Sequence, residues 1–316
     1  MKFFFAAFLA LLGSAAVGHS SAASIEKRAC GNDSATLGYA AGTTGGVGGT
    51  VTTVTTLAAL TSAVSGTAKK IVYISGTISG NTVVKIGSNT SVVGKSGSSL
   101  VGVGLRVLNE ANVIIRNVKI SKVLADAGDA IGIQASHNIW IDHNDLSSDL
   151  DHDKDYYDGL LDITHGVYAT TVSYNKLYNH YKATLVGHSD DNGSEDTAIR
   201  VTYAFNYFSN LNSRTPSFRF GTGHIFNNYY ENNQDGINTR VGAQLLVENN
   251  VWSGSKNTIY STSSGYAVAR GNDYGNATAN SAPTGTFTTA PYSYSLIAAS
   301  SVKSTVTANA GQKLSC

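Results

Sequence analysis

Apolar positions along the chain fall mostly into short runs. From Ile71 onward these runs consist of β-branched and aromatic residues, and they are separated by Gly, Asn and Ser. This pattern predicts β-strands bounded by turns. A helical spacing occurs once in residues 29–316, over 57–64, with Thr55 or Thr56 as the N-cap and Gly66 as the C-terminal stop. The pattern therefore predicts an all-β protein with one short amphipathic helix.

A repeat organises the strands. Several times an apolar strand ends at an Asn that is followed by a further short apolar run. Successive Asn positions are separated by 27, 31, 31, 22, 22 and 22 residues, and they are Asn117, Asn144, Asn175, Asn206, Asn228, Asn250 and Asn272. A basic unit that tolerates insertions is typical of a solenoid, in which stacked coils share a core and Asn side chains form a ladder. The repeat predicts a right-handed parallel β-helix.

Other all-β folds fit the repeat less well. The 22-residue repeat is too long for a hairpin meander and too short for a propeller blade of roughly 40 residues. This spacing disfavours a sandwich or a propeller. Because a solenoid has open ends with unpaired strand edges, we expect the helix over 57–64 to cap one of them. The longer spacings between Asn144 and Asn206 mark loops on one face, which is often the binding face.

The N-terminus carries a secretion signal. Lys2 is followed by an apolar stretch over 3–12 and by small residues over 13–18, so we predict a signal peptide over 1–18. Residues 19–28 end in Lys27-Arg28, which indicates a propeptide with a dibasic cleavage site, although a chance basic pair is the alternative. Residues 29–316 then form a single β-helix domain. No segment approaches the ~20 apolar residues that a transmembrane helix needs, so we predict a secreted, extracellular protein with no membrane partner.

Charge and cysteine content narrow the partners further. The 22 basic and 21 acidic residues make only 14% of the chain, which argues against a nucleic-acid partner. Cys30 and Cys316 can pair in an oxidising compartment if the two tails meet, and the sequence leaves that open. We expect a monomer that carries glycosylation acceptors at Asn32, Asn89, Asn192 and Asn276.

Acidic residues gather in the middle coils of this charge-poor chain. Hard oxygen ligands without paired Cys or His point to Ca²⁺ and away from zinc. Asp158 and Asp162 frame the start of a strand, and four extended residues span roughly 13 Å, so the two can share one ion only if the backbone bends near Gly159. Asp129, on the preceding coil, can stack beside them. For the acids over 149–155 we prefer a solvated loop.

Cations follow one and two coils later. Lys182 precedes Arg214 and Arg219, which flank Pro216. Each alone is as readily a surface charge as a functional group. Beside an acidic patch that binds a cation, the three together favour a polyanion between them, and a polymer of carboxylated sugars fits.

With these residues assembled, the chain resembles the pectate lyases of polysaccharide lyase family 1. The match is carried by the WIDH motif, by R-x-P-x-x-R over 214–219, and by the segments 112–121, 128–147, 158–166, 172–182 and 213–221. The resemblance implies the right-handed parallel β-helix that the repeat predicts independently.

The resemblance also assigns roles. It implies Ca²⁺ ligation by Asp129, Asp158 and Asp162, with Asp158 standing where many members have Glu. A further acid of the family's metal site is Ala127 here. It implies that Arg214 is the catalytic base and that Lys182 and Arg219 bind substrate carboxylates. We interpret Asp142 and His143 of the WIDH motif as structural.

The implied reaction is β-elimination in (1→4)-α-D-galacturonan, or pectate, to 4,5-unsaturated oligogalacturonides, with Ca²⁺ as cofactor. Because arginine stays protonated near neutral pH, an arginine base implies an alkaline optimum. The alternatives are a pectin lyase acting on methyl-esterified chains, a hydrolytic polygalacturonase and a non-catalytic carbohydrate-binding protein. The first has an aromatic-rich cleft, whereas Trp140 and Trp252 are the only tryptophans here; the second needs acidic motifs that this chain lacks.

Overall fold

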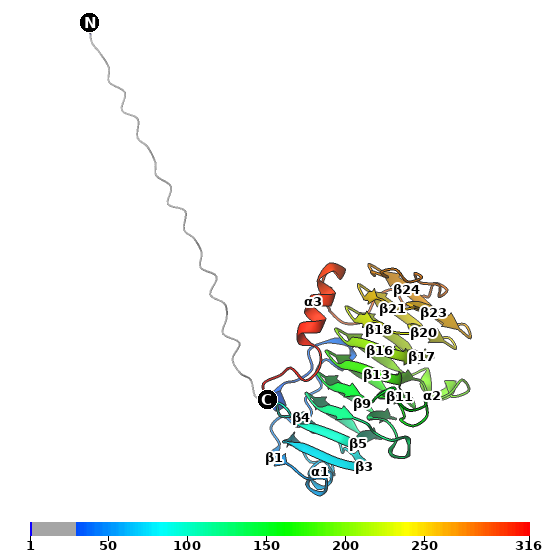
Figure 1. Cartoon of the computed structure of the whole chain (residues 1–316). Coiled ribbons are helices and arrows are strands. Elements are labelled where there is room, and N and C mark those ends of the chain that lie inside the picture. Colours follow the sequence, from blue (N-terminus) through cyan, green and yellow to red (C-terminus); the bar gives the residue numbers. More distant parts are fainter. Residues whose placement is uncertain (2–29) are drawn as a thin grey trace.

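Parallel strands wind into a stack of coils in this computed structural model (Figure 1). It describes residues 30–316 together with Met1, so the predicted signal peptide and propeptide otherwise lie outside the described residues. Strands of consecutive coils pair in parallel. Connections between parallel strands of one sheet are right-handed in nearly all proteins. The predicted right-handed parallel β-helix is confirmed.

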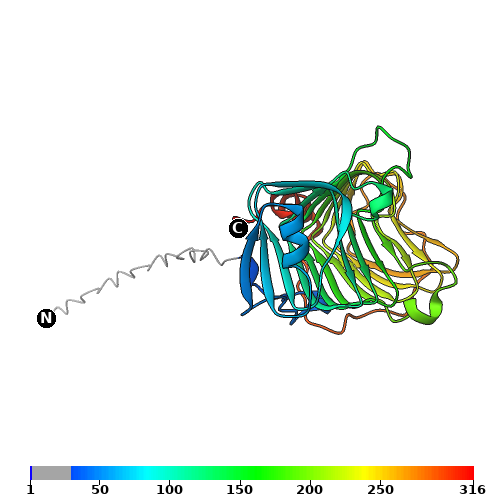
Figure 2. The same ribbon diagram turned by 90° about the horizontal axis from the view of Figure 1, so that it is seen from below.

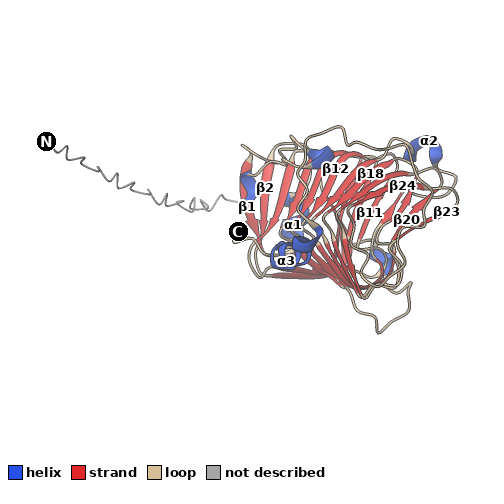
Figure 3. Cartoon of the chain, turned by 90° about the horizontal axis from the view of Figure 1, so that it is seen from above, coloured by secondary structure: helices blue, strands red, loops and turns tan. Residues whose placement is uncertain are grey.

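The coils present three sheets (Figure 3). Sheet 1 contains ten strands in chain order: β1 (Thr50–Val54), β2 (Lys70–Ile74), β4 (Thr90–Gly94), β6 (Ala111–Arg116), β9 (His137–Asp142), β12 (Tyr168–Ser173), β15 (Arg200–Ala204), β18 (Thr222–Phe226), β21 (Gln244–Glu248) and β24 (Tyr266–Arg270). Its pairing is continuous, so each coil is hydrogen-bonded to the coils on both sides.

The long strand β5 (Ser99–Leu108), which β3 (Thr77–Lys85) also pairs, joins the other two sheets. Its first half pairs with β7 and begins sheet 2: β7 (Lys119–Ser121), β10 (Asp145–Ser147), β13 (Lys176–Lys182), β16 (Tyr207–Ser213), β19 (Tyr229–Glu231) and β22 (Val251–Ser253). Its second half pairs with β8 and begins sheet 3: β8 (Ile131–Gln134), β11 (Leu161–Thr164), β14 (Leu185–Val186), β17 (Ser217–Arg219), β20 (Ile237–Arg240) and β23 (Ile259–Thr262).

The predicted asparagine ladder runs from Asn144 to Asn272. From Asn175 onward, the side-chain oxygen of each Asn accepts hydrogen bonds from the backbone N–H and the side-chain amide of the Asn on the preceding coil, at 2.8–3.1 Å. Asn144, Asn175, Asn206, Asn228 and Asn250 are fully buried. The ladder therefore satisfies amide groups that burial would otherwise leave unpaired.

The prediction that Asn117 begins this ladder is wrong by one residue. Arg116 pairs with Asp142, so Asn117 aligns with His143 and the ladder position is Val118. The Val118 N–H donates to the Asn144 side chain, which continues the ladder in backbone form. Asn117 adopts a φ of 57° instead and binds the C-terminal tail through the backbone of Leu314.

The interior is apolar and gains aromatic stacks toward the C-terminal coils. Ile, Val and Leu fill the early coils, whereas Phe208, Tyr230, Trp252 and Tyr274 stack with ring centroids 4.8, 4.7 and 5.6 Å apart. Coil-to-coil stacking of like residues follows from the parallel, in-register pairing, because equivalent side chains lie about 4.8 Å apart.

A helix covers one end of the stack, and the other helices lie along its sides (Figure 2). As predicted, α1 (Leu57–Ala63) caps the first coil, with the Thr56 hydroxyl accepting from the Ala59 N–H and with Leu60 buried. The remaining helical segments are α2 (Gly193–Asp196), α3 (Ala299–Asn309), η1 (Cys30–Asn32), η2 (Gly38–Ala40) and η3 (Ala125–Ala127). Among the described residues, the helices are all too short or too polar to cross a membrane.

The two tails meet. α3 packs beside the late coils, and the chain then returns along the stack to the first coils (Figure 1). There Cys316 forms a disulfide with Cys30, with the Cα atoms 5.6 Å apart. The pairing that the sequence left open therefore exists.

Candidate active site

The predicted site residues lie at the start of sheet 3 and on the turns that lead into it from sheet 2. Asp129 precedes β8, Asp162 lies in β11, Lys182 ends β13, and Arg219 ends β17. Strands β8, β11, β14 and β17 are consecutive neighbours in sheet 3. Residues that are far apart in the sequence are thereby brought to successive coils of one face.

Two buried carboxylates meet at Gly159. The Gly159 N–H donates to Asp129 Oδ1 at 3.0 Å, and the Leu185 N–H donates to Asp162 Oδ1 at 2.9 Å. A Cβ atom on residue 159 would lie 2.5 Å from Asp162 Oδ1 and 2.9 Å from Asp129 Oδ1. Only glycine leaves room for both acids at this turn.

The electrostatic state of this pair is unusual. Burial, reinforced by the Asp162 and Asp158 carboxylates, raises the pKa of Asp129 well above its ordinary value. Burial also raises the pKa of Asp162 to about 7, although Arg214 opposes that shift. Two acids that burial and mutual repulsion penalise in this way are relieved by a bound cation.

Asp158 is paired with a lysine and is more exposed than the other two acids. Its carboxylate lies 3.4 Å from Lys182 Nζ, and its side chain is 42% exposed. Asp155, predicted to be a solvated acid, also pairs with Lys182 at 3.3 Å. Within residues 30–316, no three acidic, Cys or His side chains converge closely enough to surround a cation.

Arg214 lies on the turn between β16 and β17, in a left-handed conformation with a φ of 63°. Its N–H donates to Asp235 Oδ2 at 3.0 Å, and its carbonyl accepts from the Thr184 N–H at 2.9 Å. The Asp235 side chain is itself held by Tyr260 at 2.6 Å. Over the described residues, the Arg214 guanidinium makes no ion pair or hydrogen bond, although its backbone is firmly held.

Arg219 is held by an acid that the sequence analysis did not single out. Its Nε donates to Asp190 at 2.5 Å, and Arg240 on the next coil donates to the same carboxylate at 2.9 and 3.0 Å. Arg219 and Arg240 are register partners in β17 and β20. The repeat could have revealed Arg240, because it lies one coil after Arg219.

Arg106 is a second residue that the sequence analysis missed. It pairs in register with Gly132 in β8, which in turn pairs with Asp162 in β11. Its Nε is buried without a hydrogen-bond partner, and its charge acts on Asp129. A lone basic residue within the apolar strand VGVGLRVL was the available signal.

The donor chemistry fits Ca²⁺. Asp129 and Asp162 supply hard carboxylate oxygens at one turn, and their raised pKa values indicate that negative charge there lacks compensation. Asp158 reaches the same acids electrostatically and is the exposed member of the three. Asp129 and Asp162 are therefore buried next to the same turn, whereas Asp158 is more exposed and is paired with Lys182.

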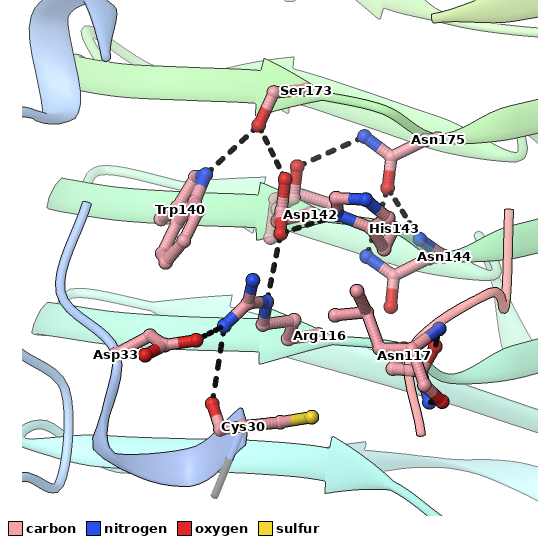
Figure 4. A network of polar contacts seen from close by, with 12 residues as sticks. Cys30, Asp33, Arg116, Asn117, Trp140, Asp142, His143, Asn144, Ser173 and Asn175 are labelled. Carbon is pink, nitrogen blue, oxygen red and sulfur yellow. Dashed lines mark hydrogen bonds and ion pairs between the residues drawn. The ribbon is translucent and has the colours of Figure 1, made fainter. Parts of the chain in front are cut away.

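The WIDH motif lies elsewhere, on the outer face of sheet 1 (Figure 4). Asp142 is 1% exposed and binds Arg116 Nε at 2.8 Å, Ser173 Oγ at 2.6 Å and His143 Nδ1 at 2.7 Å. The Arg116 guanidinium also contacts Asp33 and stacks 4.9 Å from the Trp140 ring. Every acidic and basic group of this network is paired, which supports the interpretation of Asp142 and His143 as structural.

Comparisons with known proteins show which family the sequence matches. The pectate lyase family profile matches residues 19–315. The chain is 58% identical over 297 residues to a probable pectate lyase A of Neosartorya fischeri, covering 92% of each chain. It is 56% identical over 294 residues to pectate lyase A of Aspergillus niger, covering 91% of this chain and 90% of the other.

Solved structures give the same result. A Bacillus pectate lyase in complex with trigalacturonate superposes with a TM-score of 0.79 at 35% identity, covering 87% of this chain and 98% of the other. Pectate lyase II of Xanthomonas campestris superposes with the same TM-score at 31% identity and the same coverage. The fold, the family profile and these likenesses agree, and the chain belongs to the pectate lyase family.

Proposed function

We propose that this protein cleaves polygalacturonate by Ca²⁺-dependent β-elimination and releases 4,5-unsaturated oligogalacturonides. The observation that carries the proposal is the contrast between Arg214 and its neighbours. Lys182 and Arg219 each pair with carboxylates, whereas the guanidinium of Arg214 has no such partner among the described residues and acts on buried Asp162. Because the Arg214 guanidinium lies near the acids and has no partner among the described residues, it is available to a substrate.

In this reaction Arg214 would take the proton from C5 of a galacturonate unit. The electron pair of the C–H bond becomes the C4–C5 double bond, and the glycosidic oxygen leaves C4 with the electron pair of the broken bond and takes up a proton from water. Fixing the Arg214 backbone through Asp235 and Thr184 would orient the guanidinium for this step. Because arginine loses its proton only at high pH, we expect the rate to rise into the alkaline range.

The remaining residues would bind and stabilise. Asp129, Asp162 and Asp158 would hold the Ca²⁺ ion, which when bound neutralises the substrate carboxylate and so makes the C5 proton more acidic. Lys182 and Arg219 would bind carboxylates of the polymer. These carboxylates would replace Asp155 and Asp158 as partners of Lys182, and Asp190 as the partner of Arg219. The acids of these pairs are 42–64% exposed, and ion pairs that water reaches are weak, so such an exchange is feasible.

The deciding experiment follows the ultraviolet absorbance of unsaturated product from polygalacturonate at alkaline pH. We expect absorbance to rise with Ca²⁺, to stop with excess chelator, and to fall by about 10³-fold or more in Arg214→Ala. Arg270→Ala, which removes an exposed arginine from the last coils, is the matched control.

Other results would change the proposal. Product that forms despite chelator would favour a pectin-lyase-like reaction on methyl-esterified chains. Reducing ends without unsaturated product would indicate a hydrolase, and binding without cleavage would indicate a carbohydrate-binding protein. A rate maximum below about pH 6 would argue against Arg214 as the base.

We also propose that the protein is secreted as a monomer after removal of the signal peptide and propeptide. The disulfide between Cys30 and Cys316 supports an oxidising compartment. Mass spectrometry of the culture medium, with N-terminal sequencing, tests this directly: a mature terminus near Ala29 is expected.

A further inference from the structure

Asp190 occupies a position that the proposed reaction does not explain. Its carboxylate bridges Arg219, at 2.5 Å, and Arg240, at 2.9 Å. The two arginine side chains are only 14% and 22% exposed, whereas Asp190 is 52% exposed. Two largely buried cations on neighbouring coils are therefore neutralised by a single acid that reaches them from the solvent side.

The loop that carries Asp190 is firmly anchored. Asp196 is fully buried and accepts hydrogen bonds from the His188 N–H at 2.6 Å, the Gly166 N–H at 3.0 Å and the Asn192 side chain at 3.0 Å. At the base of the loop, a Cβ atom on Gly187 would lie 2.6 Å from the Cβ of Arg219. The backbone of the loop is thus fixed against β17, while the Asp190 carboxylate at its tip stays exposed.

The pairing leaves one hydrogen-bonding group of Arg240 unused. Its Nε is buried without a partner, although both of its bonds to Asp190 are short. Asp190 therefore pairs with both arginines but leaves the Nε–H group of Arg240 without an acceptor. A carboxylate of a bound polymer could take the same position.

We propose that Asp190 is a specificity-determining residue that acts as a surrogate carboxylate for Arg219 and Arg240. Where the bound polymer presents a free carboxylate, that group displaces Asp190. Where the polymer presents a methyl ester, Asp190 stays and keeps the arginines paired, so that the cleft accepts partly esterified galacturonan. The proposal rests on the proposed function, because it takes Arg219 as a contact of the substrate.

The physical basis is the cost of an unpaired charge. A mostly buried guanidinium that faces an ester loses solvation and gains no ion pair, which is unfavourable. With Asp190 in place this penalty is avoided, but a free carboxylate must compete with Asp190 for the same two arginines. Asp190 thus aids binding of esterified galacturonan and opposes binding of free carboxylates. Its removal should therefore strengthen the binding of polygalacturonate and weaken the binding of esterified chains.

Asp190→Asn is the test, and Asp191→Asn is the control. Asp191 lies on the same loop, is exposed and bonds to Ser189, so the control removes the same charge without touching either arginine. Activity is measured on polygalacturonate and on pectin with about half of its carboxyls esterified, each with Ca²⁺. Trigalacturonate binding is measured by calorimetry in an Arg214→Ala background, where turnover does not interfere.

For Asp190→Asn we expect the KM for polygalacturonate and the Kd for trigalacturonate to fall about two- to fivefold, because the half-exposed Asp190 carboxylate competes only weakly for the two arginines. We expect kcat/KM on the half-esterified pectin to fall by a similar factor, and Asp191→Asn to change neither. Asp190→Glu, which keeps the charge, should restore wild-type preference in part.

Three results would overturn the proposal: a change in the same direction on both substrates, an equal effect of Asp191→Asn, or a wild-type protein that cleaves polygalacturonate but neither cleaves nor binds half-esterified pectin. Wild-type protein inactive on every substrate would instead contradict the proposed function. The calorimetric titration would still decide the role of Asp190, because tighter binding of trigalacturonate in Asp190→Asn needs no turnover.

Discussion

Two buried acidic groups in this molecule are treated in opposite ways. Asp142 on sheet 1 binds Arg116, Ser173 and His143, so its charge is fully compensated (Figure 4). Asp162 on sheet 3 is 9% exposed, yet its only hydrogen-bond donor among the described residues is the Leu185 N–H. The same solenoid therefore holds one buried acid with a full set of partners and, on another face, a buried acid with few partners.

The difference separates structure from function. A compensated buried acid has no remaining capacity for a ligand, and breaking its pairs costs stability. An uncompensated buried acid already lowers stability, and that cost is typical of functional sites that await a ligand. We therefore expect substitutions in the two regions to affect different quantities.

The largest expected effect is that of Asp162→Asn on activity. Removing this carboxylate removes a hard ligand beside Asp129, so we expect kcat/KM on polygalacturonate to fall by about 10³-fold. Because the change also removes repulsion between buried acids, the free energy of unfolding should not decrease. If the loss of activity is matched by a loss of folded protein in circular dichroism, Asp162 serves stability, and the contrast with Asp142 is wrong.

Next in size is the effect of Asp142→Asn on stability. The substitution leaves Asp33 as the only acidic partner of Arg116 among the described residues, and we expect the free energy of unfolding in denaturant to fall by about 3 kcal/mol. Activity per folded molecule should remain close to that of the wild type. Asp151→Asn, which changes an exposed acid, serves as the control and should leave the unfolding midpoint in place.

Calcium itself should distinguish the two regions. At a concentration of 100 times Kd, an ion that binds only the folded state adds about 2.7 kcal/mol to its stability. We expect this thermal stabilisation in the wild type and in Asp142→Asn, and its loss in Asp162→Asn. Stabilisation of Asp162→Asn equal to that of the wild type would exclude this acid as a ligand.

The smallest expected effect concerns pH and His224, a second paired residue on sheet 1. Burial lowers the pKa of His224 to about 4, against the raising effect of Glu248, which lies 3.0 Å from Nε2. Tyr292, Tyr294 and the cation of Arg270, 3.8 Å from Glu248, complete its surroundings.

The sign of this pH effect follows from the depressed pKa. The unfolded chain takes up the proton near pH 6.5, while the folded protein takes it up only near pH 4. Stability is therefore fully present above about pH 6.5 and is lost as pH falls, and the shift of His224 alone accounts for a loss of roughly 2 kcal/mol at pH 5. His224→Gln should remove about half of the loss, because burial also lowers the pKa of His180 to about 4. An unchanged pH profile of unfolding would rule out this source.

The fold could be predicted because its signal is repeated. The Asn of the ladder recurs at each coil, so one misaligned residue, Asn117, does not alter the conclusion. The helix α1 could be predicted from its own cap and stop residues. Both signals are local, and local patterns survive without knowledge of the tertiary structure.

The site was less accessible to sequence reasoning. Asp129, Asp158 and Asp162 stood out as acids in a charge-poor chain, and the structure brings Asp129 and Asp162 to one turn, at Gly159. The pairing of Asp158 with Lys182 depends on side-chain direction, which no spacing reveals. Asp190 lies on an inserted loop outside the repeat, so neither periodicity nor register indicated that it meets Arg219.

The closure of the two tails has a mechanical consequence. A solenoid pulled by its ends would normally unwind coil by coil, because each coil contacts only its neighbours. Here the disulfide joins residues 286 positions apart, at the beginning and end of the described chain. A force applied at the termini is therefore carried by the covalent link, and the coils between them bear no load until that link is reduced.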